Sequence, residues 1–204
     1  MNRALRTLYL LGLLCLSSQA LAFDLAQLSE QLAKPAMVRG SFVQEKHLRA
    51  LPQPLVSQGK FVLAKNFGLL WLLETPLRQD YRITNAGIAR RETQGGANVW
   101  KLLPGKSAGA EQNRLFLAVL QGDSSGLQRD FDLKLKGSAD SWQLELVPRS
   151  LFLQQVFKQI NIEGGELVRR IELLETQGDR TVLKMNDSNA AASLTDAQRN
   201  DFAN

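Results

Sequence analysis

The sequence predicts a mainly β protein with helices, of the α+β class, built on an antiparallel sheet. About ten or eleven short stretches alternate apolar and polar residues with period two, and turn residues separate most of them. Helical patterns occur at the start, in the middle and at the end of this series. Strands that follow one another through short turns form an antiparallel meander, whereas regularly alternating strands and helices would indicate a parallel sheet.

Residues 1–22 have the pattern of a cleavable signal peptide. Two arginines supply the positive charge, the apolar run of residues 8–16 follows, and Ala20-Leu21-Ala22 is a small-x-small cleavage pattern. The apolar run is about half of the ~20 residues that a transmembrane helix needs. We therefore expect cleavage before Phe23 and export from the cytoplasm.

The single cysteine, Cys15, lies inside this apolar run. Leucines precede it, whereas a lipoprotein signal needs a small residue there, so we expect no lipidation. After cleavage the chain would hold no cysteine, which excludes a disulfide and a thiolate metal site. Without the two arginines of the leader, 23 basic residues remain beside 20 acidic ones. This mild excess is typical of a solvated surface, and the alternative is that it helps approach to an anionic membrane surface.

The first helix of the exported chain is expected directly after Phe23. Asp24 is a suitable N-cap, and Gln27 is placed to complete a capping box. Apolar residues follow at the spacing of one helix face, at Leu25, Leu28 and Leu32, and Lys34-Pro35 ends the pattern.

Period two then predicts the strands of the sheet. They cover residues 38–45, 59–63, 68–73, 79–84, 88–93, 99–103, 127–136, 142–146, 160–162, 167–175 and 181–185. Glycine-rich turns such as Asn85-Ala86-Gly87, Gly95-Gly96 and Gly164-Gly165 separate neighbouring strands.

Three further segments interrupt or follow this series. A helix is expected over residues 110–121, with Leu115, Phe116, Val119 and Leu120 as its apolar stripe and Gly122 as its stop. Residues 149–157 are apolar without a clean period, which fits a short helix or an ordered loop. Residues 186–192 are small and polar and predict a linker, after which Thr195 and Gln198 form a capping box for a last short helix.

Residues 68–73 are apolar on both faces of a strand whose neighbours have one polar face each. Both sides of this strand must therefore be covered. A strongly curved sheet with an apolar concave side under helices is one solution, and a plain packed core is the other.

The titratable residues do not form a recognisable catalytic site. His47 is the only histidine, which excludes a multi-histidine metal site. It sits at the polar end of a strand, and the sequence has no nucleophile elbow. Asp130 and Asp132 alternate with apolar residues, as on a solvated strand face. The basic pairs Arg90-Arg91 and Arg169-Arg170 point to opposite faces, so they predict no nucleic-acid stripe. We expect no enzyme, metal or cofactor.

Several short motifs together resemble a known family. Residues 40–44 (Gly-Ser-Phe-Val-Gln) follow the amphipathic helix, a Gly-initiated strand covers residues 59–63, and the next strand holds Trp71 before Thr75-Pro76. Residues 173–181 look like a late hairpin of a divergent branch. From Leu25 to Met185 the chain thus resembles the LolA-like superfamily of periplasmic outer-membrane lipoprotein carriers.

The resemblance implies an incomplete antiparallel β-barrel, a strongly curved sheet wrapped over a helical lid, with an apolar cavity for acyl chains. Its implied lining residues here are Phe42, Phe61, Leu69, Trp71, Leu73, Phe116 and Val119. Where the family carries an Arg-Pro pair that holds the lid closed, this chain has Lys65-Asn66. Lysine lacks the bidentate fork of arginine, so Lys65 implies a looser or different lid latch.

The resemblance also implies a function. Residues 23–187 would form a soluble, monomeric periplasmic carrier or chaperone, followed by a linker and a short helix or tail over residues 188–204. Its cargo would be acyl chains of a lipoprotein or another lipid-linked envelope product, taken from an inner-membrane donor complex and delivered toward an outer-membrane acceptor. A lipid-sensing regulatory module on the same scaffold is the alternative, and a lipid-modifying enzyme is a third reading that needs a polar catalytic group.

Overall fold

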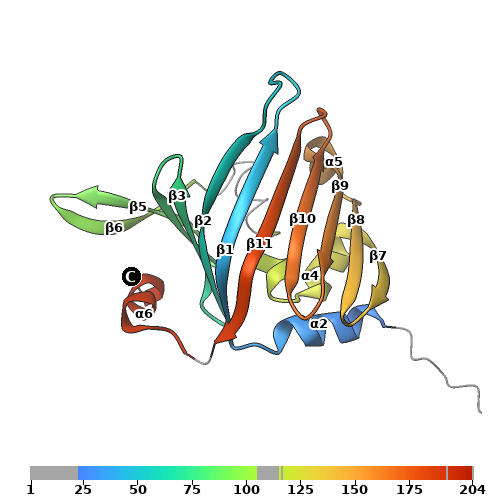
Figure 1. Cartoon of the computed structure of the whole chain (residues 1–204), viewed down its shortest axis with the longest axis horizontal. Helices are drawn as coiled ribbons and strands as arrows, with labels where there is room; N and C mark the ends of the chain where they lie inside the picture. Colours follow the sequence, from blue (N-terminus) through green and yellow to red (C-terminus); the bar gives the residue numbers. More distant parts are fainter. Residues whose placement is uncertain (1–22, 105–114, 116, 192, 204) are drawn as a thin grey trace, which may run out of the picture.

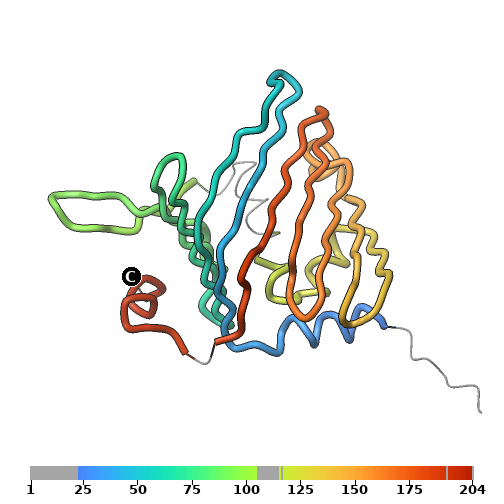
Figure 2. The backbone as a smooth tube through the Cα atoms, in the orientation of Figure 1, coloured from blue at the N-terminus to red at the C-terminus, as the bar shows by residue number. Residues whose placement is uncertain are grey.

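The computed structural model describes residues 23–104, 115, 117–191 and 193–203. In this part of the chain, eleven strands form one antiparallel sheet in the order β6-β5-β4-β3-β2-β1-β11-β10-β9-β8-β7. The strands are β1 (Met37–His47), β2 (Leu55–Ala64), β3 (Gly68–Thr75), β4 (Gln79–Thr84), β5 (Gly87–Gln94), β6 (Ala97–Leu102), β7 (Phe131–Ser138), β8 (Ser141–Pro148), β9 (Phe157–Gly164), β10 (Val168–Glu175) and β11 (Arg180–Ala191). The sheet is curved and does not close, as Figures 1 and 2 show. The predicted α+β class with an incomplete antiparallel barrel is confirmed.

The sheet consists of two meanders, β1 to β6 and β7 to β11, joined side by side through β1 and β11. This central pair runs from Met37 opposite Ala191 to His47 opposite Arg180. The hairpin of β5 and β6 extends away from the rest of the sheet as a two-stranded ribbon (Figure 1).

Four labelled helices accompany the sheet: α2 (Leu25–Ala33), α4 (Ser124–Asp130), α5 (Leu151–Val156) and α6 (Asp196–Ala203). Residues 115 and 117–120 are also helical and are called the inner helix below. The rest of the helix that the sequence predicts over residues 110–121 lies largely outside the described residues. In Figure 1, α2 runs along one end of the sheet, and the tip of the β1–β2 hairpin lies at the opposite end.

Both predicted capping boxes are present. In α2, Asp24 Oδ1 accepts a hydrogen bond from the Gln27 amide at 2.8 Å, and Gln27 Oε1 accepts one from the Asp24 amide at 3.0 Å. Before α6, Thr195 Oγ1 accepts from the Gln198 amide at 3.2 Å and Gln198 Oε1 accepts from the Thr195 amide at 3.0 Å. Each box satisfies two amides that have no partner inside the helix.

The expected strand over residues 127–136 is wrong in its first part, because α4 occupies residues up to Asp130. Leu127 and Phe131 are four residues apart, a spacing that fits one face of a helix as well as one face of a strand. Asp123 decides between the two, since its Oδ1 accepts from the Gly126 amide at 3.0 Å and caps a helix there. Asp130 therefore ends a helix and does not lie beside Asp132 on a strand face.

The linker expected over residues 186–192 is also wrong for most of its length. Strand β11 continues to Ala191 and stays paired with β1 beyond a register shift near Asp187, whose φ is +51°. A partner strand supplies hydrogen bonds to a segment that carries no apolar alternation, so composition alone does not reveal it.

For residues 149–157 the sequence allows a short helix or an ordered loop, and the structure has the short helix α5 there. Ser150 Oγ caps this helix by accepting a hydrogen bond from the Leu153 amide at 3.3 Å.

The strand that is apolar on both faces, β3, is covered on both sides. Leu69 and Trp71 belong to the main core on the concave side. Leu70 faces the other way and forms a second cluster with Met37 and Val62, against which Leu194, Phe202 and three other partly buried side chains pack. The C-terminal segment thus covers the convex face of this part of the sheet.

Charged side chains hold α6 in this position. Arg91 Nη2 lies 2.8 Å from Asp201 Oδ1 and Arg91 Nε lies 3.0 Å from Asp80 Oδ2. Arg82 Nη1 donates to the Asp201 carbonyl oxygen at 3.0 Å, and burial lowers the pKa of Arg82 while the Asp201 carboxylate raises it. Both guanidinium groups lie over the ring of Trp100, 4.6 and 5.1 Å from its centroid, as in cation–π pairs.

Candidate ligand-binding site

The concave face of the sheet has an aromatic floor. Phe42, Phe61 and Trp71 project from three adjacent strands, and the Phe61 and Trp71 ring centroids are 6.4 Å apart. Phe61 and Trp71 are direct cross-strand partners in β2 and β3, which places their side chains on one face. Leu69, on the same strand as Trp71, adjoins this floor and is completely buried.

Six of the seven implied lining residues lie together in one apolar cluster. These are Phe42, Phe61, Leu69, Trp71 and Val119 as buried members and Leu73 as a partly buried one. The seventh, Phe116, lies outside the described residues. Five of them lie on strands and Val119 lies on the inner helix. That any of them lines a cavity for cargo stays a prediction.

The inner helix and α4 fill the concave face. Leu115, Leu117, Val119 and Leu120 of the inner helix and Leu127 of α4 are all buried in the same cluster as the aromatic floor. The space between α2, the inner helix and β8 is an apolar void of only about 20 Å³. In this structure the helices therefore occupy the place that the resemblance assigns to acyl chains.

Two of these helices meet at a glycine. Gly122 follows the inner helix with φ +70°, and a Cβ there would lie 2.6 Å from the Ser29 carbonyl oxygen of α2. Ser29 Oγ donates in turn to the Gly122 carbonyl oxygen. Only glycine permits this close approach, so the predicted helix stop also sets the distance between α2 and the inner helix.

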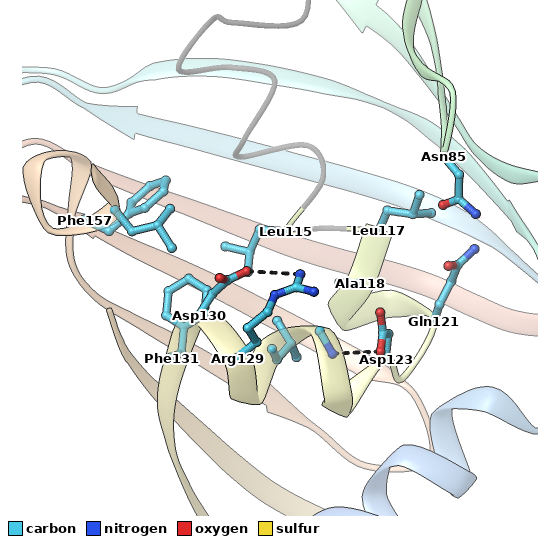
Figure 3. A pocket seen from close by; sticks show the side chains of 13 residues that line it. Asn85, Leu115, Leu117, Ala118, Gln121, Asp123, Arg129, Asp130, Phe131 and Phe157 are labelled. Atoms are coloured by element: carbon cyan, nitrogen blue, oxygen red, sulfur yellow. Dashed lines mark hydrogen bonds and ion pairs between the residues drawn. The ribbon is translucent and has the colours of Figure 1, made fainter. Parts of the chain in front are cut away.

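A cavity of about 200 Å³ opens beside the inner helix (Figure 3). Apolar side chains of the inner helix, α4, β7, α5 and β9 form one part of its wall, and polar side chains form the other part. The apolar lining comprises Leu115, Leu117, Ala118, Leu127, Phe131, Leu153 and Phe157, and the polar lining comprises Asn85, Gln121, Asp123, Arg129 and Asp130. Such a mixed wall suits an amphipathic molecule with an apolar body and a polar end.

A larger groove of about 590 Å³ adjoins this cavity. It lies among the end of α2, the turns after β2 and β4, and the residues that follow the inner helix, and it shares Asn85, Gln121 and Asp123 with the cavity. Phe67 and Phe202 form part of its wall, with ring centroids 5.7 Å apart. The cavity and the groove thus share a border of three polar side chains.

Sequence reasoning missed this polar border. Asn85 was expected only as a turn residue, and Gln121 only as a helix end. Asp123 has a local signal, since an aspartate three residues before Gly126 is a typical N-cap. The Gly126 amide holds the pKa of the Asp123 carboxyl below its ordinary value, with a further contribution from the Ser125 hydroxyl. Asp123 is therefore a charged group at the junction of the cavity and the groove.

Lys65 lies at the edge of the groove, directly after β2. Its Nζ donates to the Ala33 carbonyl oxygen at 3.1 Å, and its amide donates to the Ala36 carbonyl oxygen at 2.9 Å. Ala33 is the last residue of α2, where carbonyl groups lack partners within the helix and the helix dipole favours a cation. Lys65 thus ties the turn after β2 to the end of α2.

The remaining titratable candidates lie apart from this site. His47 Nε2 contacts Arg180 Nη2 at 3.2 Å and Glu45 Oε2 at 3.6 Å near the far end of β1, and Asp132 pairs with Arg149 at 2.6 Å. Across the described ranges, no group of three or more His, Cys, Asp or Glu side chains could hold a metal ion. None of the helices described here has the length and hydropathy that a membrane crossing requires.

Comparison with known proteins gives one family. The model for outer membrane lipoprotein carrier protein LolA-like proteins matches residues 17–202. A search of curated protein sequences found no match.

The search of solved structures found similar chains at low identity. A LolA superfamily protein from Nitrosomonas europaea is 10% identical, with a TM-score of 0.51 over 86% of this chain and 96% of that one. A chain of the Pseudomonas aeruginosa MucA/MucB complex is 18% identical with a TM-score of 0.49, over 85% of this chain and 58% of that one. A putative outer membrane lipoprotein-sorting protein domain from Vibrio parahaemolyticus is 10% identical with a TM-score of 0.46, over 89% and 97%. The Nitrosomonas protein therefore supports the fold alone.

Proposed function

The chain belongs to the LolA-like family of outer membrane lipoprotein carrier proteins, and from this membership we propose that it is a periplasmic carrier of acyl or other lipid-like cargo. The cargo is a lipoprotein or another lipid-linked envelope product, which the carrier delivers toward the outer membrane. The proposal includes no catalytic step, because binding and release need no covalent chemistry.

The continuous apolar concave face is the observation that carries this proposal. The aromatic floor, the buried face of the inner helix and the wall of the 200 Å³ cavity belong to one cluster of contiguous side chains. Asn85, Gln121 and Asp123 border this surface where the cavity meets the groove. An acyl chain would occupy the apolar part, and a polar head group would lie near these three side chains.

The energetic reason for such a carrier is the cost of exposing acyl chains to water. Burying one methylene group contributes about 0.8 kcal/mol, so a chain of ~16 carbons costs roughly 13 kcal/mol in water. Free diffusion of a lipid between two membranes is negligible at this cost. An apolar binding surface removes most of it while leaving the cargo able to dissociate into the next membrane or acceptor.

Binding of an acyl chain on the aromatic floor would require the helices to move. Buried side chains of the inner helix and α4 cover that floor, and the cavity beside the inner helix, with about 200 Å³, is smaller than the ~300–1,000 Å³ typical of pockets for drug-sized ligands. The cargo would displace the inner helix or α4 from the aromatic floor and take over its apolar contacts. Lys65 ties the sheet to α2, and Ser29 of α2 contacts Gly122 at the end of the inner helix. Lys65 is therefore the proposed latch of this movement.

Native mass spectrometry tests the proposal. The chain is expressed with its own N-terminal segment, recovered from a Gram-negative periplasm and analysed intact, and bound lipids are then extracted and identified. A bound acylated species supports the carrier and gives the cargo class. Protein that is reproducibly empty and also takes up no fluorescent fatty acid would contradict it.

A matched pair of variants locates the binding site. Ala118 lines the cavity and Ala97 is exposed at the start of β6, so Ala118→Phe and Ala97→Phe make the same chemical change at two places. We expect Ala118→Phe to lower fatty-acid affinity about tenfold, which corresponds to 1.4 kcal/mol. Ala97→Phe should leave it unchanged. Equal affinity in both variants would place the binding site elsewhere.

A further inference from the structure

One end of the sheet exposes several large apolar side chains. They lie on the β1–β2 hairpin and on α5, and their exposed fractions range from 45% to 79%. The residues are Leu51, Leu55 and Val56 on the hairpin and Leu151 and Phe152 on α5, and together they are called the apolar rim. Exposed leucine or phenylalanine side chains are ordinary singly, but a group at one end of a fold indicates a contact surface.

Hydrogen bonds connect the two parts of the apolar rim through the β10–β11 turn. The Arg49 amide of the hairpin donates to Asp179 Oδ1 at 2.9 Å. On the other side of the turn, the Thr176 amide donates to the Val156 carbonyl oxygen at 3.0 Å and Thr176 Oγ1 donates to the Gln154 carbonyl oxygen at 2.8 Å. The hairpin, the turn and α5 therefore form one edge, which Figure 1 shows at the end of the sheet opposite α2.

The charges that flank the two apolar segments of the rim along the chain are basic. Residues 46–57 and 149–158 contain no aspartate or glutamate, while Lys46 and Arg49 precede the hairpin tip and Lys158 follows α5. Among the described residues, the side chains of these three make no ion pair. The acidic groups nearby all have partners. Glu45 lies 2.7 Å from Lys184 and Asp132 lies 2.6 Å from Arg149. At the β10–β11 turn, Asp179 Oδ1 accepts from the Arg49 amide at 2.9 Å and Glu175 Oε1 accepts from the Thr181 hydroxyl at 3.4 Å.

We propose that the apolar rim docks on the surface of an anionic lipid bilayer. Leucine and phenylalanine side chains enter the boundary between head groups and acyl chains, and nearby lysine and arginine side chains are attracted to anionic head groups. The basic residues flank both apolar segments, so apolar insertion and electrostatic attraction act on the same edge of the molecule. This charge complementarity favours an anionic membrane over an uncharged apolar partner.

The position of α5 links this surface to the candidate cavity. Its residues Leu151 and Phe152 are exposed on the apolar rim, whereas Leu153 is buried and lines the 200 Å³ cavity. Consecutive residues of α5 thus face the proposed bilayer contact and the apolar interior. The docking proposal goes beyond the carrier function and does not depend on it, since membrane binding is measured without cargo.

Vesicle sedimentation tests the docking. The periplasmic protein is mixed with vesicles of phosphatidylethanolamine and phosphatidylglycerol, or with vesicles of phosphatidylcholine alone, at low and high salt. We expect binding to the anionic vesicles that weakens by about tenfold with high salt or uncharged lipid. Absence of binding to anionic vesicles would overturn the proposal and leave a protein partner as the occupant of the apolar rim. Equal binding to both lipid mixtures would overturn the role of charge.

Two double variants, each with a matched control, test the residues. Leu55→Ser with Phe152→Ser removes apolar side chains, and Lys46→Glu with Arg49→Glu reverses charge. Each should lower anionic-vesicle binding about tenfold. The controls make the same changes on exposed residues away from the rim: Val99→Ser with Leu102→Ser on β6, and Lys34→Glu with Lys136→Glu.

The controls should bind like the parent chain. A loss of binding in a control as large as in the rim variants would overturn the assignment to this edge. Fatty-acid affinity, measured on the same proteins, should stay unchanged in the rim variants. This separates a failure of docking from a failure of the carrier function.

Discussion

Phe42 of β1 stacks on Trp71 of β3 although β2 lies between their strands. Their ring centroids are 3.7 Å apart and the ring planes differ by 19°. Gly59 of β2 lies opposite Phe42 and makes the stack possible, since a Cβ on this glycine would lie 2.8 Å from Phe42 Cζ. The aromatic floor of the concave face thus depends on a missing side chain in the strand between.

Gly59→Ala should therefore destabilise the fold. The added Cβ would lie 2.1 Å from the Leu72 carbonyl oxygen, and backbone cannot move aside without breaking the pairing of β2 with β3. We expect the free energy of unfolding to fall by about 2 kcal/mol or more, at the upper part of the range for overpacked sites. Chemical denaturation followed by tryptophan fluorescence measures it. Gln58→Ala, at the exposed neighbouring position, is the control, and an equal effect in both variants would refute the packing explanation.

Lys65→Met should speed cargo uptake if Lys65 is the lid latch. The change removes the hydrogen bond to the Ala33 carbonyl oxygen and keeps most of the side-chain volume. We expect fluorescent fatty acid to enter several-fold faster in stopped-flow mixing, with a loss of stability of about 1 kcal/mol or less. Lys60→Met removes a lysine that pairs with Glu74 at 2.9 Å on the sheet, and it should not alter the uptake rate. Unchanged uptake in Lys65→Met would exclude Lys65 as the latch.

Asp201→Ala should loosen the C-terminal helix α6. The variant removes the ion pair between Asp201 and Arg91, and both side chains are only about a quarter exposed. We expect a loss of about 1 kcal/mol, together with a change in the fluorescence of Trp100, which lies beside Arg91. Binding of an apolar dye should rise as Leu70 and Val62 become accessible. Asp196→Ala, at an exposed aspartate in the first turn of the same helix, should leave both signals near those of the parent chain.

The cap at Asp123 should make stability depend on acidic pH. Because the Gly126 amide lowers the pKa of this carboxyl in the folded state, the unfolded chain binds its proton more readily. The stabilisation is fully present above the ordinary pKa of about 3.9 and disappears as the pH falls through the lower folded value. Asp123→Ala should cost about 1 kcal/mol at neutral pH, and the difference from the parent chain should shrink below about pH 4.

Denaturation curves over a series of pH values measure this difference. Asp140→Ala, which removes an exposed carboxylate from the β7–β8 turn, controls for the loss of one negative charge. A constant difference between Asp123→Ala and the parent chain down to pH 2 would show that the carboxylate form of Asp123 does not stabilise the cap.

Local chemistry explains which elements could be predicted. The Asp24 and Gln27 side chains form their hydrogen bonds within a segment of four residues, so the capping box can be predicted without any tertiary contact. Period-two alternation likewise marks a strand with one buried face. It failed at Leu127, because an apolar spacing of four satisfies both a helix and a strand until Asp123 is recognised as a cap. It failed again after Met185, where pairing with β1 supports a polar strand.

The candidate site shows the same division. Phe42, Phe61 and Trp71 could be placed on one face from alternation and the family resemblance. Asn85 and Gln121 could not, since they are far apart in the chain and meet only because the turn after β4 lies against the end of the inner helix. No local pattern distinguishes a turn asparagine that borders a cavity from one that faces solvent.

The sequence by itself determined the β class, the helix caps and the apolar face of most strands, because these follow from interactions between residues close together in the chain. The tertiary structure alone decided that the helices fill the concave face, that Leu70 is covered by the C-terminal segment, and that the hairpin and α5 share one edge. Those arrangements arise from contacts between distant segments, which form only when the whole sheet curves and brings its two meanders together.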